Sequence, residues 1–157
     1  MEVCITDNCP IELANMYKNG LDSWKFINNK GNAGLDLRYC GTTSLVIKPD
    51  EQVLIGTGIR IWLDNKKACG FVYPRSGLGT KGLVLANTVG VIDSSYQGEI
   101  KLALRNTSNL NIVIDIFDRI AQYVIQPVVL PDSVEITSEF TGTTQRGSAG
   151  FGSTGTK

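Results

Sequence analysis

A period of two along the chain decides the fold, and it is clearest in Ile100-Lys101-Leu102-Ala103-Leu104-Arg105. Successive side chains of a strand point to opposite faces, so the bulky apolar residues of this stretch share one face and the two cations share the other. Residues 111–116 repeat the alternation with three isoleucines on one face. Both stretches therefore predict half-buried strands.

Similar apolar runs, separated by turn residues such as proline, aspartate and asparagine, extend the pattern over most of the chain. The runs cover 53–63, 68–73 and 120–125, and the turn sequences lie at 48–51, 63–65 and 106–109. No segment has a sustained helical period, although one short helix could follow Ser76 or occupy 11–18. We expect an all-β, jelly-roll-like barrel or sandwich with at most one short helix.

Length and composition place this pattern in one domain of ordinary size. The chain has 157 residues, 42% of them hydrophobic, and a formal net charge of zero. Zero net charge removes any general electrostatic reason to expect nucleic-acid or membrane partners. No apolar run approaches the roughly 20 residues that span a bilayer, and the first residues lack signal-peptide features. We expect an intracellular, cytoplasmic protein that is not secreted.

The cysteines and the absence of histidine limit which metal sites and which acid–base residues the chain can supply. Cys4, Cys9, Cys40 and Cys69 lack the spacing of a metal site, and the chain has no histidine, so no zinc site is expected. Free and mostly buried thiols are the expectation for a reducing compartment. Without histidine, carboxylates become the leading candidates for acid–base chemistry.

The glycine-rich end of the chain, 146–157, carries groups that suit a nucleotide. So much glycine predicts mobility until a ligand organises the segment. Arg146 offers a guanidinium fork and Ser153 and Thr154 offer hydroxyls for phosphate oxygens. Phe151 offers a face on which a base can stack. The alternative is a plain glycine and serine linker.

Polar residues interrupt the strand rhythm in four further places. In 32–38, Asp36 lies between two leucines, so its carboxylate either caps a turn or pairs with a cation. In 73–79 a strand ends abruptly at Arg-Ser-Gly, which suits an oxyanion cradle or a plain turn. The segment 86–98 gathers an amide, a carboxylate and an aromatic ring, and a hairpin with an Asp-Ser-Ser turn is its alternative. The segment 117–125 opens a strand with an arginine and a glutamine, and its alternative is an exposed strand face.

Together with the tail, these segments resemble the ordered motifs of the trimeric deoxyuridine triphosphatase (dUTPase) family. The resemblance extends from 33 to 155, in the family's order and with similar spacing. Its motifs read Pro-Arg-Ser-Gly-Leu at 74–78, Gly-Val-Ile-Asp at 90–93, Arg-Ile-Ala-Gln at 119–122 and Gly-Phe-Gly-Ser-Thr-Gly at 150–155.

The resemblance implies hydrolysis of dUTP to dUMP and pyrophosphate by a water that attacks the α-phosphorus. Such an enzyme limits uracil incorporation into DNA and supplies dUMP for dTMP synthesis. Asp93 resembles the carboxylate that orients and deprotonates the water, while Mg²⁺ is held by the phosphates and water. Asp36 resembles a supporting residue of the phosphate region. The implied phosphate contacts are Arg75, Ser76, Gly77, Gln122, Arg146, Ser153 and Thr154. The implied base and sugar contacts are Asn87, Gly90, Val91, Ile92, Tyr96 and Phe151.

The resemblance also implies a homotrimer whose active sites are shared between subunits. In that scheme residues 1–145 form the barrel and 146–157 form a flexible lid over a site built by other chains. The chain departs from the family pattern at Ser95, where a second acid is common, at Gln97, where arginine is frequent, and at Ala149, which replaces a glycine. We expect these departures to tune activity.

Two alternatives stay open. A dCTP deaminase has a related fold but releases ammonia, and the pattern around 91–93 together with the Phe-Gly-Ser-Thr tail favours the triphosphatase. A non-enzymatic binding protein on the same scaffold could dispense with Asp93, Arg146 and Phe151, which are all present.

Overall fold

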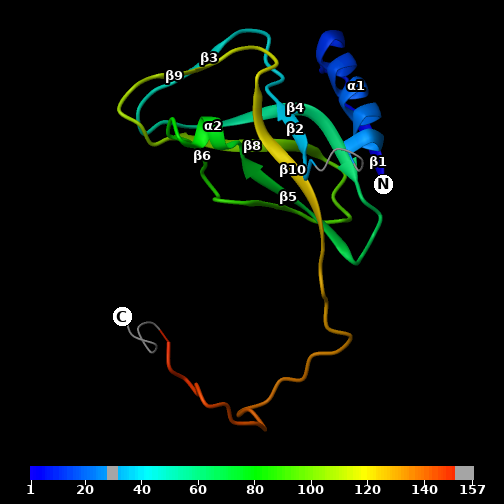
Figure 1. Ribbon diagram of the computed structural model, residues 1–157, viewed down its shortest axis with the longest axis vertical. Coiled ribbons are helices and arrows are strands. Elements are labelled where there is room, and N and C mark those ends of the chain that lie inside the picture. The colour runs from blue at the N-terminus through cyan, green and yellow to red at the C-terminus, as the bar shows by residue number, and fades with distance from the viewer. Residues whose placement is uncertain (28–31, 151–157) are drawn as a thin grey trace.

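A computed structural model describes residues 1–27 and 32–150, and most of its regular structure is β (Figure 1). All five expected strands occur at the expected places, since the three apolar runs and the two alternating stretches all form strands. In chain order the elements are β1 (Glu2–Ile5), α1 (Ile11–Ile27), β2 (Leu35–Arg38), β3 (Leu45–Ile47), β4 (Gln52–Trp62), β5 (Ala68–Pro74), α2 (Ser76–Gly79), β6 (Leu83–Leu85), β7 (Gly90–Ile92), β8 (Glu99–Asn106), β9 (Ile112–Ile114) and β10 (Arg119–Pro127).

Antiparallel pairing arranges the described strands in two four-stranded sheets and a ribbon. One sheet has the order β1-β4-β8-β6, the other has the order β2-β10-β5-β7, and β3 pairs with β9. In β8 the side chains of Ile100, Leu102 and Leu104 are buried while Lys101 and Arg105 are exposed. The inward faces of both sheets contribute to one apolar core. The all-β, jelly-roll-like prediction is confirmed.

The prediction of at most one short helix is wrong, because both candidate segments are helical. The first helix runs from Ile11 to Ile27, well beyond the expected 11–18. Among the described side chains of this helix, only those of Leu13, Ala14 and Tyr17 are buried. Polar residues between them obscure the helical spacing of the apolar positions. The Tyr17 hydroxyl donates to the Thr57 carbonyl at 2.8 Å and accepts from the Arg38 amide at 2.9 Å. Tertiary contacts that the sequence pattern hides therefore hold α1 on β2 and β4.

A fully buried amide, Asn106, ties the end of β8 to the β3–β9 ribbon. Its Nδ2 donates to the carbonyls of Ile47 at 2.9 Å and of Leu110 at 2.7 Å. Its Oδ1 accepts from the backbone N–H and the hydroxyl of Ser108, at 2.9 and 2.8 Å. The side chain is therefore satisfied on all sides, as burial of an amide requires.

Replacement of Asn106 by alanine is expected to cost about 3 kcal/mol of unfolding free energy and to lower Tm by about 10 °C. The loss arises because buried carbonyl and N–H groups keep no partner. Thermal and urea unfolding followed by circular dichroism would measure it. Asn109→Ala, an exposed neighbour in the same turn, is the matched control and should stay within about 0.5 kcal/mol. Equal effects of the two variants would contradict the assignment.

Beyond β10 the chain leaves the barrel as an extended arm, 128–150, seen as the orange and red trace in Figure 1. Its one backbone hydrogen bond to the barrel within the described residues joins the Val128 N–H to the Lys67 carbonyl at 2.9 Å. Apolar side chains along the arm, among them Val129, Ile136 and Phe140, are almost wholly exposed. No helix among the described residues is both long and apolar enough to cross a membrane.

Candidate active site

An aspartate clamped by two arginines organises the first group of predicted site residues. Asp36 on β2 forms an ion pair with Arg75, whose Nε lies 3.0 Å from Oδ1, and accepts a hydrogen bond from Arg119 Nη1 at 3.3 Å. Arg75 lies at the junction of β5 and α2, and Arg119 opens β10. All three side chains remain partly exposed, so each pair contributes at most about 1 kcal/mol to stability. The carboxylate of Asp36 holds the two guanidinium groups side by side, so, of the two alternatives for Asp36, pairing with a cation is confirmed.

These residues line an open polar cleft of about 550 Å³. The amide of Gln122 lies in it and donates to the Pro74 carbonyl at 3.2 Å, which leaves its second N–H for a ligand. Beside it, α2 begins at Ser76 without a side-chain cap in the described structure. A Cβ added at Gly77 would meet nothing within 4 Å, so the helix start faces open space. The cleft lining comprises Asn32, Ala33, Gly34, Asp36, Arg75, Ser76, Gly77, Arg119 and Gln122.

Three of the predicted base and sugar residues, Val91, Ile92 and Tyr96, line a second cleft of about 200 Å³ together with Asp93, Glu99, Ile100 and Lys101. The Tyr96 hydroxyl donates to the Glu99 carbonyl at 3.0 Å, and the Tyr96 N–H donates to the Asp93 carbonyl at 3.0 Å. A Cβ at Gly98 would collide with the Tyr96 ring, so glycine there lets the ring lie flat on the loop. The turn thus fixes Tyr96 close to Asp93.

Two other predicted residues, Asn87 and Gly90, lie at the opposite end of β7 from Asp93. Gly90 is buried against Val72, and a Cβ there would approach the Val72 Cβ to 3.1 Å. The exposed Asn87 stands in the turn before β7. The hairpin alternative for this segment is wrong, because β7 pairs with β5 while β8 belongs to the other sheet. The segment 93–98 instead crosses between sheets, which explains why its polar side chains reach a cleft.

Within one chain the two clefts lie at opposite ends of β5. Ile92 pairs with Gly70, so Asp93 follows at the level of Cys69, whereas Arg75 comes directly after Pro74. Burial first and the carboxylate of Asp93 second raise the pKa of the Cys69 thiol, which agrees with that placement. The strand between these two levels spans about 20 Å at roughly 3.3 Å per residue. One chain therefore does not bring Asp93 and Arg75 to the same phosphates.

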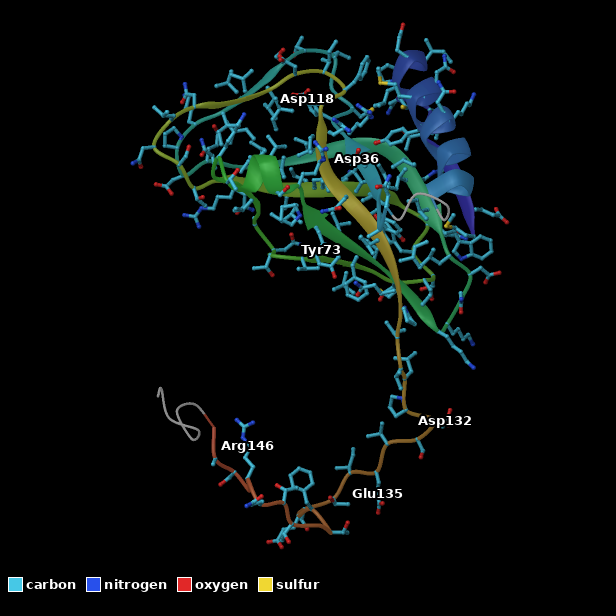
Figure 2. The ribbon with its side chains drawn as sticks, in the orientation of Figure 1. Asp36, Tyr73, Asp118, Asp132, Glu135 and Arg146 are labelled. Carbon is cyan, nitrogen blue, oxygen red and sulfur yellow. The ribbon has the colours of Figure 1, made fainter. Side chains whose placement is uncertain are left out.

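The predicted residues of the tail lie apart from both clefts or outside the described residues. Figure 2 shows Arg146 far along the arm from Asp36, and its Nε donates to the Ala149 carbonyl at 2.9 Å. Phe151, Ser153 and Thr154 lie outside the described residues.

Three charged cleft residues were absent from the predicted site, namely Arg119, Glu99 and Lys101. Arg119 opens the Arg-Ile-Ala-Gln motif and was visible in the sequence, although only the fold reveals its pairing with Asp36. Glu99 and Lys101 follow the alternation of an ordinary strand, so the sequence carried no signal for them.

Comparison with known proteins shows which family has this sequence and this fold. The family model described as dUTPase matches residues 24–155. The chain belongs to the dUTPase family. A deoxyuridine 5'-triphosphate nucleotidohydrolase of Legionella pneumophila strain Paris is 48% identical over 126 residues, covering 80% of this chain and 82% of that protein. One from Neisseria meningitidis serogroup A is 43% identical over 149 residues, covering 94% and 98%.

Solved dUTPases share the fold. A mutant of the Staphylococcus bacteriophage 80alpha dUTPase, determined with dUpNHpp, aligns with a TM-score of 0.68 at 26% identity over 79% of this chain and 86% of that one. The dUTPase from Streptococcus mutans aligns with a TM-score of 0.57 at 29% identity over 65% of this chain and 83% of that one.

All four cysteines of this dUTPase-family chain are free, as expected. Their burial differs from the prediction, because Cys4 is exposed, Cys9 and Cys40 are partly exposed, and only Cys69 is buried. The expectation of mostly buried thiols was therefore wrong.

Proposed function

We propose that this member of the dUTPase family hydrolyses dUTP to dUMP and pyrophosphate, with Asp93 as the general base. The main support is the presence of a carboxylate-bearing cleft and an arginine-bearing cleft on one scaffold, in a chain of this family. Such an activity keeps uracil out of DNA and supplies dUMP for dTMP synthesis. Its proposed place is the cytoplasmic nucleotide pool, which suits four free thiols.

The site is completed between subunits of a homotrimer. A base must come within hydrogen-bond reach of the water that it activates, and the water must meet the α-phosphorus. About 20 Å of strand separates Asp93 from Arg75 in one chain. The phosphate cleft of one subunit and the base cleft of its neighbour therefore hold one dUTP, and a symmetric trimer repeats that arrangement three times.

In the phosphate cleft the charge and the donors match a triphosphate. Asp36 holds Arg75 through Nε, and the Arg119 carbonyl accepts from Arg75 Nη1 at 3.4 Å, which leaves Nη2 and the second Nη1 hydrogen for phosphate oxygens. Free backbone N–H groups at the start of α2 and the second N–H of Gln122 add neutral donors. These groups place the α-phosphorus and stabilise the charge that grows on the departing pyrophosphate.

In the base cleft, hydrogen bonding distinguishes uracil from cytosine, and steric fit distinguishes deoxyribose from ribose. The backbone of residues 90–92 and the amide of Asn87 present fixed groups to the edge of uracil. Cytosine would leave its amino group facing donors, and such a buried mismatch can cost on the order of 10⁴ in specificity. Tyr96, held over Gly98 and bonded to the Glu99 carbonyl, packs under the deoxyribose and excludes a ribose 2'-hydroxyl.

Magnesium fits this site only as an ion carried by the substrate. The described residues contain no group of three histidine, cysteine or acidic side chains able to hold a metal. Asp36 already accepts from two guanidiniums. Phosphate oxygens and water supply the hard oxygen ligands that Mg²⁺ prefers. When bound, the ion would neutralise phosphate charge, while Asp93 orients and deprotonates the attacking water.

The tail closes the site in this proposal. Arg146, Ser153 and Thr154 grip the γ-phosphate, and Phe151 stacks on uracil, from a chain other than those that form the clefts. The support is the arm that leaves the barrel with its apolar side chains uncovered, because such an arm reaches away from its own clefts.

Mixing two inactive variants tests the shared site. Asp93→Asn and Arg75→Ala subunits should each be inactive as homotrimers, yet unfolding and refolding them together in equal amounts should restore about a quarter of wild-type turnover. That fraction follows because a site needs one intact base and one intact cradle from different chains. Pyrophosphate release from dUTP measures it. Mixtures as inactive as the separate variants would contradict a site shared between subunits.

A product screen separates this function from its alternatives. Pyrophosphate and ammonia should be measured with dUTP, dCTP, dTTP and UTP in the presence of magnesium. Pyrophosphate from dUTP alone is the expected result. Ammonia from dCTP would identify a deaminase, and tight binding of a nonhydrolysable dUTP analogue without turnover would identify a binding protein.

A further inference from the structure

The thiols of Cys9 and Cys40 come from distant parts of the chain and meet beside Gly58 of β4. Neither cysteine belongs to the lining of the two clefts. Cys9 lies between β1 and α1, and Cys40 follows β2. A Cβ built at Gly58 would lie 2.8 Å from the Sγ of each, so the two sulfurs are separated by no more than twice that distance. Both are free and partly exposed. They form a dithiol within reach of small solutes.

The space for this pair is made by the backbone of β4. Gly58 has φ +73°, a left-handed conformation that favours glycine, and lies where the pairing of β4 with β8 shifts register. Its carbonyl accepts from the Thr6 N–H at 3.0 Å, and the Gly56 carbonyl accepts from the Cys40 N–H at 3.1 Å. The same segment therefore holds the backbone on both sides of the dithiol.

We propose that Cys9 and Cys40 are a reversible redox modification site that closes to an intramolecular disulfide on reaction with an oxidised low-molecular-weight disulfide such as oxidised glutathione. The thiolate of one cysteine attacks the small disulfide, forms a mixed disulfide and releases one small thiolate. The second cysteine loses its proton to solvent and attacks the first Sγ, which releases the other small thiolate. The protein loses two electrons and two protons, and the small disulfide becomes two thiols.

The order of attack follows from the contact between the thiols. Burial is the largest cause that raises the pKa of both thiols, that of Cys40 to about 12, and the Glu99 carboxylate raises both further. The neighbouring Cys40 thiol partly offsets the rise in the pKa of Cys9. Cys9 therefore ionises first and attacks the small disulfide, and Cys40 resolves. Because both thiols are mostly protonated near neutral pH, the reaction is slow there and accelerates as pH rises.

The crosslink would tie residue 9 to residue 40 and so close a loop that contains α1. A chain with this loop closed has less freedom when unfolded, so oxidation is expected to raise Tm by about 5 °C or more. None of the residues assigned to nucleotide binding or catalysis takes part in the crosslink, although the Glu99 carboxylate, from a residue that lines the base cleft, accepts from the Gly58 N–H at 2.8 Å.

The test incubates the full chain with oxidised glutathione at pH 7, 8 and 9, blocks free thiols by alkylation, and maps peptides by mass spectrometry. The expected product is a Cys9–Cys40 link within one chain, which forms faster at each higher pH and is reversed by dithiothreitol. Failure of this link to form in the wild-type protein, or a link that joins other cysteines or separate chains, would overturn the proposal.

Variants sharpen the result. Cys40→Ser should accumulate glutathione on Cys9, Cys9→Ser should react slowly, and neither should gain thermal stability on oxidation. Cys4→Ser, which removes the exposed thiol of β1, is the matched control and should crosslink like the wild type. A crosslink that leaves Tm unchanged or lowers it would contradict the stabilising closure.

Discussion

Asp93→Asn is expected to lower kcat for dUTP by about 10³-fold, roughly 4 kcal/mol of activation free energy, and to leave nucleotide binding nearly intact. The amide has almost the shape of the carboxylate but cannot take a proton from water. Asp93 is exposed at the mouth of the base cleft and is not part of the apolar core. The fold should therefore survive the change. Steady-state pyrophosphate release gives kcat, and calorimetry with a nonhydrolysable analogue gives the affinity.

Asp132→Asn is the matched control, because Asp132 is an exposed carboxylate on the arm and away from the barrel (Figure 2). It should leave kcat within about twofold, which is well under 1.36 kcal/mol of barrier. If Asp93→Asn lowers kcat by less than about tenfold, another group must activate the water.

Deletion of residues 146–157 is expected to lower kcat/KM for dUTP by about 10²-fold or more, while Tm and the oligomeric state stay unchanged. The described part of the segment, 146–150, is exposed and its backbone bonds stay within 144–149, so the barrel loses no support. The nucleotide loses a charge-assisted contact from Arg146, about 1.5–3 kcal/mol, and a stacking face from Phe151, about 1–3 kcal/mol.

Arg146→Lys separates the two contributions, because lysine keeps the charge but lacks the planar fork. It should retain more activity than the deletion and less than the wild type. Lys157→Ala controls for the loss of a terminal charge and should behave as the wild type. Near-normal turnover of the deleted chain would contradict the role of the tail as a lid.

The strand pattern was readable in the sequence where alternation ran for six residues or more, as in β4, β8 and β10. It was not readable at β6 and β7, where only three residues form each strand and the flanking residues do not extend an alternation. The length of α1 could not be predicted from the sequence either, because the helix packs through a few side chains and through the Tyr17 hydroxyl, which is hydrogen-bonded to β2 and β4. The site motifs were visible as breaks in the strand rhythm.

Local sequence indicated which residues are candidates for the chemistry, because carboxylates, guanidiniums and glycines interrupt the apolar strand pattern at those positions. It also determined the all-β class, because side-chain alternation is a property of neighbouring residues. Only the tertiary structure decided which of those residues meet. Strand register placed Asp36 between Arg75 and Arg119 and put Asp93 at the far end of β5, and register depends on pairing between segments that are distant in the chain.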